Sequence, residues 1–238
     1  MGKGVVFDAG GLNLKPPSAM TGMHGDKSGA AVVGAIFGNM AGKMAAAGIR
    51  LVALMPMVEN TISGSAMRPG DIVKACNGLT VEIGDTDAEG RLILADALAY
   101  AGKEYPGASC MIDFATMTGY GTTIHHDLAA VFYTLDDALS KRVIEAGDAM
   151  GERVWRMPPW SEYAYLTGSK VADVRSYGWG TQDDGFMASL FLGRFIHASC
   201  KSWMHVDISK NTLSGDESDT PFIATGVALG VELLTTLT

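Results

Sequence analysis

The chain has 238 residues, of which 47% are hydrophobic and 18% are charged, so it can bury a sizeable core and is neither disordered nor fibrous. Its net charge of −8 excludes a generally basic surface, and nucleic acid is therefore not an expected partner. The three cysteines are widely spaced in apolar surroundings, which favours reduced thiols and a cytoplasmic location.

The first half of the chain alternates short apolar runs with longer helical segments. It predicts a buried strand ending in a glycine turn at 4–11 and a tightly packed helix at 28–48. A buried strand at 49–60 and a hairpin at 71–84 follow. Pro56 should stop the second strand. Asn77-Gly78 between β-rich runs is a strong signal for the turn of the hairpin.

The second half continues this alternation. It predicts a helix at 91–100, a core strand at 108–119, an amphipathic helix at 135–150 and a loop at 155–163. A helix at 187–199, a strand at 202–209 and a last helix at 221–237 follow. Strands and helices that alternate without a repeat indicate a single α/β unit, with a mixed sheet sandwiched between helices in three layers.

Several acidic residues and one glycine-ended loop follow predicted strands. The acidic residues are Asp8, Asp87 and Glu89, and the loop is 115–119. Because ligand sites in open α/β sheets lie at the carboxyl ends of strands, we expect these residues to meet at one edge of the sheet.

The segment DTDAEGRL, residues 85–92, allows two interpretations. Thr86 and Glu89 match a capping box, in which both side chains satisfy the first amides of a helix. That leaves Asp87 and Arg91 unexplained, and carboxylates held close together repel each other unless a cation joins them. Taken singly, Asp8 could be a turn residue and Asp26 the N-cap of the following helix.

Taken together, these residues resemble the leucyl aminopeptidase family of cytosolic dinuclear metallo-exopeptidases. The signature of that family is NTDAEGRL, which differs from this chain only at Asp85. The resemblance runs through nearly the whole chain and includes GKGVVFDAGGLNLK at 2–15, DFATMTG at 113–119 and WMHVDIS at 203–209.

The resemblance implies two divalent metal ions with the ligands Lys3, Asp8, Asp26, Asp87 and Glu89. Asp8 and Glu89 would bridge the ions, and Lys3 could ligate only as the neutral amine. Oxygen ligands with one nitrogen suit Zn²⁺ or Mn²⁺, with Mg²⁺ and Co²⁺ as alternatives.

The implied activity is that of a metal-dependent aminopeptidase, which hydrolyses the first bond of peptides with a free N-terminus by a metal-activated water. Lys15 would stabilise the oxyanion, and Arg91 would hold a bicarbonate ion as general base. The substrate cleft would be lined by Thr116, Met117, Thr118 and Gly119. His205 and Asp207 are an alternative metal pair, although the resemblance places no ligand there.

We expect residues 1–238 to form a catalytic metallopeptidase domain that lacks the N-terminal domain of the family and the first part of its catalytic domain. The resemblance also implies a homo-oligomer, which is a hexamer in the family. The alternative is a truncated, non-catalytic scaffold or oligomer module of the same fold. We find neither a signal-peptide layout nor an apolar run suited to a bilayer, so no membrane partner is expected.

Overall fold

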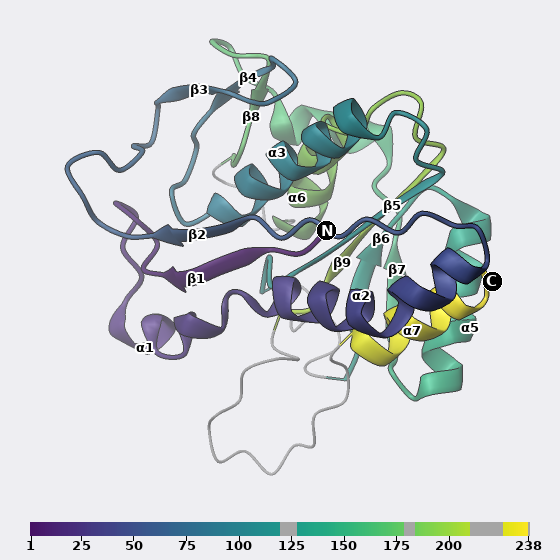
Figure 1. Ribbon diagram of the computed structural model, residues 1–238. Helices are drawn as coiled ribbons and strands as arrows, with labels where there is room; N and C mark the ends of the chain where they lie inside the picture. Colours follow the sequence, from purple (N-terminus) through teal and green to yellow (C-terminus); the bar gives the residue numbers. More distant parts are fainter. Residues whose placement is uncertain (120–127, 179–183, 210–225, 238) are drawn as a thin grey trace.

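The computed structural model describes residues 1–119, 128–178, 184–209 and 226–237. At its centre lies a mixed sheet with the strand order β5-β9-β6-β7 (Figure 1). The strands are β5 (Cys110–Ala115), β9 (Ser202–Asp207), β6 (Ala130–Tyr133) and β7 (Val154–Met157). β5 runs parallel to β9 and β6 parallel to β7, whereas β6 and β9 are antiparallel.

Two further strands extend this sheet beyond β5. β1 (Gly4–Asp8) pairs in parallel with β2 (Met57–Asn60). The residues that lead into β1 join it to β5, because Gly2 and Phe114 form a parallel bridge and the Lys3 amide donates to the Phe114 carbonyl at 3.0 Å. β1, β2, β5 and β9 therefore end at the same edge of the sheet.

Helices cover both faces, as Figure 1 shows. One face carries α2 (Ser28–Ala46), α5 (Asp137–Met150) and α7 (Val227–Thr235), whose apolar side chains form one core with Phe114. The other face carries α3 (Glu89–Glu104) and α6 (Asp184–Gly193), which form a second core with Met111. The predicted three-layer α/β/α architecture is confirmed.

The predicted hairpin is also confirmed. β3 (Ile72–Lys74) and β4 (Thr80–Glu82) are antiparallel, and β8 (Val174–Arg175) pairs in parallel with β4. Gly78 has a φ of +92° in the turn, a conformation that glycine adopts without a steric penalty. The short helices are α1 (Pro17–Met20) and two 3₁₀ segments, Met23–Gly25 and Ser161–Thr167.

Two predictions about strands were wrong. In the segment 49–60 the strand follows Pro56 instead of ending there, because pairing with β1 begins at Gly4 and Met57. This strand is largely exposed. The segment 155–163 is not loop throughout, because its first residues form β7, whose pairing with β6 is a long-range contact that the local sequence does not reveal.

Helix boundaries moved by a few residues. The helix predicted at 91–100 is longer, Glu89–Glu104, and the one predicted at 187–199 is Asp184–Gly193. The last predicted helix begins at Val227, and its residues 221–225 lie outside the described residues. Within the described part of the chain, no helix is both long and apolar enough to cross a membrane.

Candidate functional site

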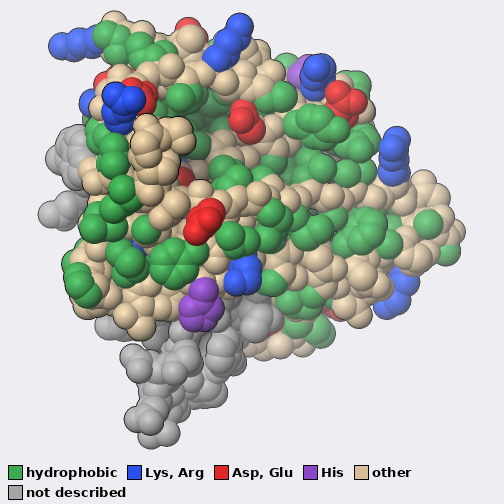
Figure 2. Space-filling view, turned by 60° about the vertical axis from the view of Figure 1, so that its left-hand side comes forward, with side chains coloured by type: hydrophobic (Ala, Val, Ile, Leu, Met, Phe, Trp, Pro, Cys, Tyr) green, Lys and Arg blue, Asp and Glu red, His purple; other side chains and the backbone are tan. Residues whose placement is uncertain are grey.

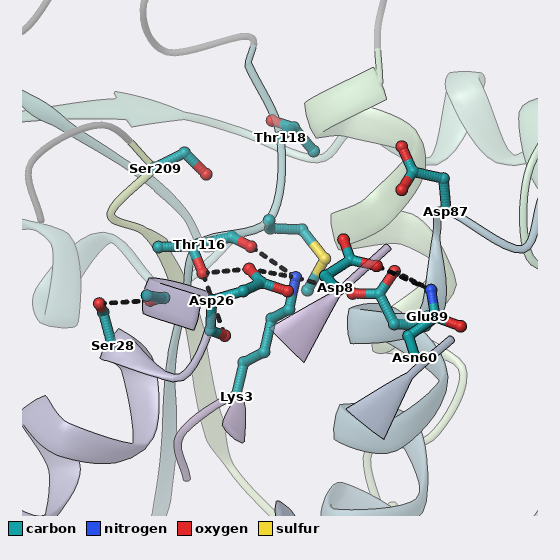
Figure 3. Close-up of polar contacts among 12 residues, drawn as sticks. Lys3, Asp8, Asp26, Ser28, Asn60, Asp87, Glu89, Thr116, Thr118 and Ser209 are labelled. Atoms are coloured by element: carbon teal, nitrogen blue, oxygen red, sulfur yellow. Dashed lines mark hydrogen bonds and ion pairs between the residues drawn. The ribbon is translucent and has the colours of Figure 1, made fainter. Parts of the chain in front are cut away.

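Acidic and basic side chains from distant segments meet at the carboxyl edge of the extended sheet (Figure 3). Lys3 precedes β1 and Asp8 ends it, while Asp26 follows the 3₁₀ segment Met23–Gly25. Asp87 and Glu89 stand at the beginning of α3. The structure thus brings together the five residues that the sequence analysis proposed as metal ligands.

Three of these carboxylates are both buried and close together. Asp8, Asp26 and Glu89 each offer an oxygen, and these oxygens all lie within 4.8 Å of one another. Asn60 at the end of β2 donates from Nδ2 to Asp8 Oδ1 at 2.8 Å and to Glu89 Oε2 at 3.3 Å. Carboxylates this close repel each other strongly in a buried environment, so cations are required nearby.

Lys3 supplies one of the cations. Its Nζ lies 2.9 Å from Asp26 Oδ1 and 2.9 Å from Glu89 Oε1, and it donates to the Thr116 carbonyl at 2.8 Å. Burial by itself would lower the pKa of Lys3, but the charges of Glu89 and Asp26 outweigh burial and raise it. Burial and the charge of Glu89 raise the pKa of Asp26 to about 7, against the opposing effect of Lys3.

Lys15 supplies the second cation. Its Nζ lies 2.9 Å from Asp8 Oδ2 and 2.6 Å from Asp87 Oδ1. Burial would lower the pKa of Lys15, but its hydrogen bonds with Asp87 and Asp8 outweigh burial and raise it. Burial raises the pKa of Asp87 to about 6 despite the contact with Lys15.

The donor set suits divalent cations better than two lysines alone. The cluster contains more carboxylates than ammonium groups, so negative charge remains. Asp26 Oδ2 is buried and has no hydrogen-bond partner among the described residues. A buried, unpartnered carboxylate oxygen beside further carboxylates is a combination that hard cations stabilise.

Two glycines of the motifs allow these side chains to approach. Gly10 has a φ of +87° in the turn after β1. A Cβ at Gly90 would lie 2.6 Å from Lys3 Cε and 2.7 Å from Lys3 Nζ, so a side chain at this position would force the buried Lys3 to move.

The capping-box interpretation of Thr86 is wrong. Helix α3 has Ala88 at its N-cap and no side chain that caps it. The Thr86 hydroxyl instead donates to the Gly10 carbonyl at 2.6 Å and accepts from the Asn13 amide at 2.8 Å. Asp85 accepts from the Asp87 amide at 2.8 Å. Thr86 therefore joins the entry of α3 to the glycine turn after β1.

The predicted substrate loop, 116–119, lies beside the cluster. The Thr116 hydroxyl donates to Asp26 Oδ1 at 2.7 Å. The amides of Met117 and Thr118 donate to Asp207 at 3.1 and 2.9 Å, and the Thr118 hydroxyl donates to it at 2.7 Å. Asp207 thus holds this loop, a role that the sequence analysis missed because it depends on the pairing of β5 with β9.

His205 and Asp207 have protein partners instead of forming a metal pair. His205 Nδ1 lies 2.5 Å from Asp113 Oδ1, and Asp207 binds the loop. Among the described residues, only Asp8, Asp26 and Glu89 form a group of three potential metal-ligating side chains.

Arg91 is buried two residues after Glu89. Its Nη1 donates to the Ser176 carbonyl at 2.9 Å, and its Nη2 lies 2.5 Å from Asp184 Oδ1. Its guanidinium carbon is 5.5 Å from the ring centre of Tyr177. Asp184 carries no functional signal in the local sequence, since only the packing of α3 against α6 brings it to Arg91.

Figure 2 shows a face on which lysine and arginine side chains are dispersed between hydrophobic ones. The exposed large hydrophobic residues of the chain include several from β2, β3 and the segment between them, namely Met57, Val58, Ile62, Ile72 and Val73.

Comparisons with known proteins identify a family. The family model described as "Cytosol aminopeptidase family, catalytic domain" matches residues 1–235. A probable cytosol aminopeptidase of Chlorobium limicola is 43% identical over 238 residues, which are 100% of this chain and 46% of that protein. Another, of Chlorobaculum tepidum, is 46% identical over 209 residues, which are 88% of this chain and 40% of that protein.

A solved structure is similar as well. The bottromycin maturation enzyme BotP in complex with Mn has a TM-score of 0.83 and 33% identity, and the match covers 99% of this chain and 52% of that chain. The chain thus spans about half the length of the curated relatives that it matches.

Proposed function

The chain belongs to the cytosol aminopeptidase family, and from this premise we propose that it carries a metal-dependent aminopeptidase centre. The reaction is hydrolysis of the N-terminal bond of peptides with a free N-terminus. The observation that carries the proposal is the buried cluster of Asp8, Asp26 and Glu89, with two lysines placed between carboxylates.

We propose that two divalent ions bind at this cluster, with the ligands Lys3, Asp8, Asp26, Asp87 and Glu89. The unpartnered Asp26 Oδ2 supports this assignment, and the complex of BotP with Mn supports manganese, with zinc as the alternative. When bound, such ions supply Lewis acidity, which favours the ionisation of water near neutral pH and polarises a carbonyl group.

The residues of the chain have distinct proposed roles in the reaction. Lys15 holds an ammonium group beside Asp8 and Asp87, where it can stabilise the negative charge that develops on the carbonyl oxygen of the substrate. The loop 116–119 binds the backbone of the peptide. Arg91 holds the anion that accepts a proton from the attacking water, and bicarbonate is the anion that the sequence resemblance implies.

The partners follow from the same proposal. We propose a homo-oligomer, as the sequence resemblance implies, and individually exposed hydrophobic residues such as Met57 and Ile72 are available for association. The names of the relatives support a cytoplasmic location. Light scattering combined with size-exclusion chromatography measures the number of subunits, and a monomer at all concentrations would contradict the oligomer.

Hydrolysis of leucyl-p-nitroanilide tests the function. The purified chain should turn over this substrate only with added Mn²⁺ or Zn²⁺, and Glu89→Ala should abolish turnover. Glu145→Ala, an exposed glutamate of α5, is the matched control and should keep it. Absence of metal-dependent turnover at every pH from about 6 to about 10 would instead support a non-catalytic scaffold of the same fold.

A further inference from the structure

We infer that the carboxylate of Asp184 is a built-in anion at Arg91, so that catalysis by this chain needs no bicarbonate. This inference rests on the proposed aminopeptidase function. It assigns to a side chain of the protein the role that the sequence resemblance gives to a dissolved ion.

Arg91 lies in a buried environment. Its side chain is only 2% exposed, and a buried guanidinium needs an anion and hydrogen-bond acceptors. Asp184 supplies the anion at 2.5 Å from Nη2, and the Ser176 carbonyl accepts from Nη1 at 2.9 Å. Nε is the one guanidinium nitrogen left without a hydrogen-bond partner among the described residues.

A dissolved anion would have to compete with Asp184 for its position at Arg91. Bicarbonate and a carboxylate both present two oxygens in a plane, the arrangement that a guanidinium binds through two parallel hydrogen bonds. Each Nη already donates one hydrogen bond, so a dissolved anion would have to compete with Asp184 for Nη2 or bind through the remaining N–H groups. In either case it would lie beside the negative charge of Asp184. The geometry therefore favours the side chain over the ion.

The pair of Arg91 and Asp184 joins α3, the helix that begins with Glu89, to α6. Arg91 is two residues after Glu89 on α3, and Asp184 begins α6, which lies alongside α3 (Figure 1). Tyr177 lies against Arg91. Burial and the charge of Asp184 raise the pKa of Tyr177, and the charge of Arg91 opposes this increase. The side chain of Asp184 is 34% exposed, so water can reach it.

The chemistry balances without a further reactant. As the oxygen of water bonds to the carbonyl carbon, Asp184 accepts a proton from that water. As the carbon–nitrogen bond breaks, the protonated Asp184 returns the proton to the leaving amine. The products are an amino acid and a shortened peptide, and Asp184 is again a carboxylate.

The test compares the manganese-loaded native chain with Asp184→Ala and Asp184→Asn in carbon dioxide-free buffer, with and without sodium bicarbonate at constant ionic strength. The native rate should not respond to bicarbonate. Asp184→Ala should lose about 10²-fold in kcat, as expected for loss of a general base, and should recover activity with bicarbonate. Asp184→Asn should lose activity without recovery, since its amide still fills the position.

A second measurement is independent of activity. Titration of metal-free protein into ¹³C-labelled bicarbonate should broaden the NMR signal with Asp184→Ala but not with the native chain. Asp137→Ala is the matched control, because Asp137 begins α5 and pairs with Arg156 at 2.7 Å outside the cluster. It should behave as the native chain in both measurements.

The outcomes separate this inference from the proposed function. Activation of the native chain by bicarbonate, or bicarbonate binding to native protein, would overturn the inference and leave the aminopeptidase assignment intact. A native chain without metal-dependent turnover would refute the assignment, and the NMR titration would then still decide whether Asp184 excludes the ion. If Asp184→Ala does not fold, the native chain and Asp184→Asn decide the question.

Discussion

Lys3 Nζ lies 2.9 Å from Glu89 Oε1, and this buried ion pair joins the residue before β1 to the first residue of α3. The two residues are far apart in sequence, and each belongs to a different motif. A protein cation therefore stands between carboxylates that would otherwise repel each other, and a divalent ion bound there has to displace or share this lysine.

The first prediction concerns metal binding at Glu89. Mn²⁺ should raise the melting temperature of the native chain, because an ion at about a hundred times its Kd stabilises the folded state by about 2.7 kcal/mol. Glu89→Gln should remove most of this increase, since it replaces a charged ligand by a neutral one. Differential scanning calorimetry measures the shift, and Glu145→Gln is the control. Equal shifts in both variants would contradict the assignment of Glu89.

The second prediction concerns the space at Gly90. Gly90→Ala should lower the free energy of unfolding by roughly 1–3 kcal/mol, because the new methyl group would overlap Lys3. Gly42→Ala in α2 should be neutral or stabilising by up to about 1 kcal/mol, since no atom lies within 4 Å of its Cβ position. Urea denaturation measures both. The contact with Lys3 would be disproved by equal effects of the two substitutions.

The third prediction concerns Asp207 and the loop 116–119. Asp207→Asn should raise KM by about tenfold with a smaller change in kcat, because hydrogen bonds to a charged group contribute about 1.5–3 kcal/mol and the loop would shift. Steady-state kinetics with leucyl-p-nitroanilide measures KM and kcat separately. Asp173→Asn is the control, since Asp173 accepts from the amide and hydroxyl of Thr80 in the same manner on the surface. An unchanged KM in Asp207→Asn would contradict the positioning role.

The fourth prediction concerns the pH dependence of stability at His205. Burial would lower the pKa of His205, but the charge and hydrogen bond of Asp113 outweigh burial and raise it. Because the pKa is higher in the folded than in the unfolded state, protonation of His205 stabilises the fold. This stabilisation is fully present at pH values below the unfolded-state pKa of about 6.5, and it is lost as the pH rises through the folded-state pKa.

The comparison of native chain and His205→Gln isolates this effect. The difference in their free energies of unfolding, measured by urea denaturation across pH, should be largest at acidic pH and should shrink as pH rises. The charge of Asp207 also raises the pKa of His205, and the charge of Arg91 lowers it. These two charges change the pH at which the stabilisation is lost, but the stabilisation still decreases with rising pH. A difference that grows with pH would show that the folded-state pKa is lowered.

The local elements were predictable where sequence period and turn residues agreed. Helices α2 and α5, strands β1, β5 and β9, and the hairpin of β3 and β4 were found because each has a clear pattern of apolar residues or a glycine at its turn. β7 was missed because a short edge strand before two prolines carries little local signal, and its pairing with β6 forms it.

The sequence by itself determined the family and the candidate ligands, since those depend on residue types at fixed spacing along single segments. Only the tertiary structure decided which side chains face one another. Lys3 against Glu89, Asp207 against the loop 116–119 and Asp184 against Arg91 are all contacts between distant segments. Such contacts depend on strand pairing and helix packing, which place residues in space with no trace in the local pattern of the chain.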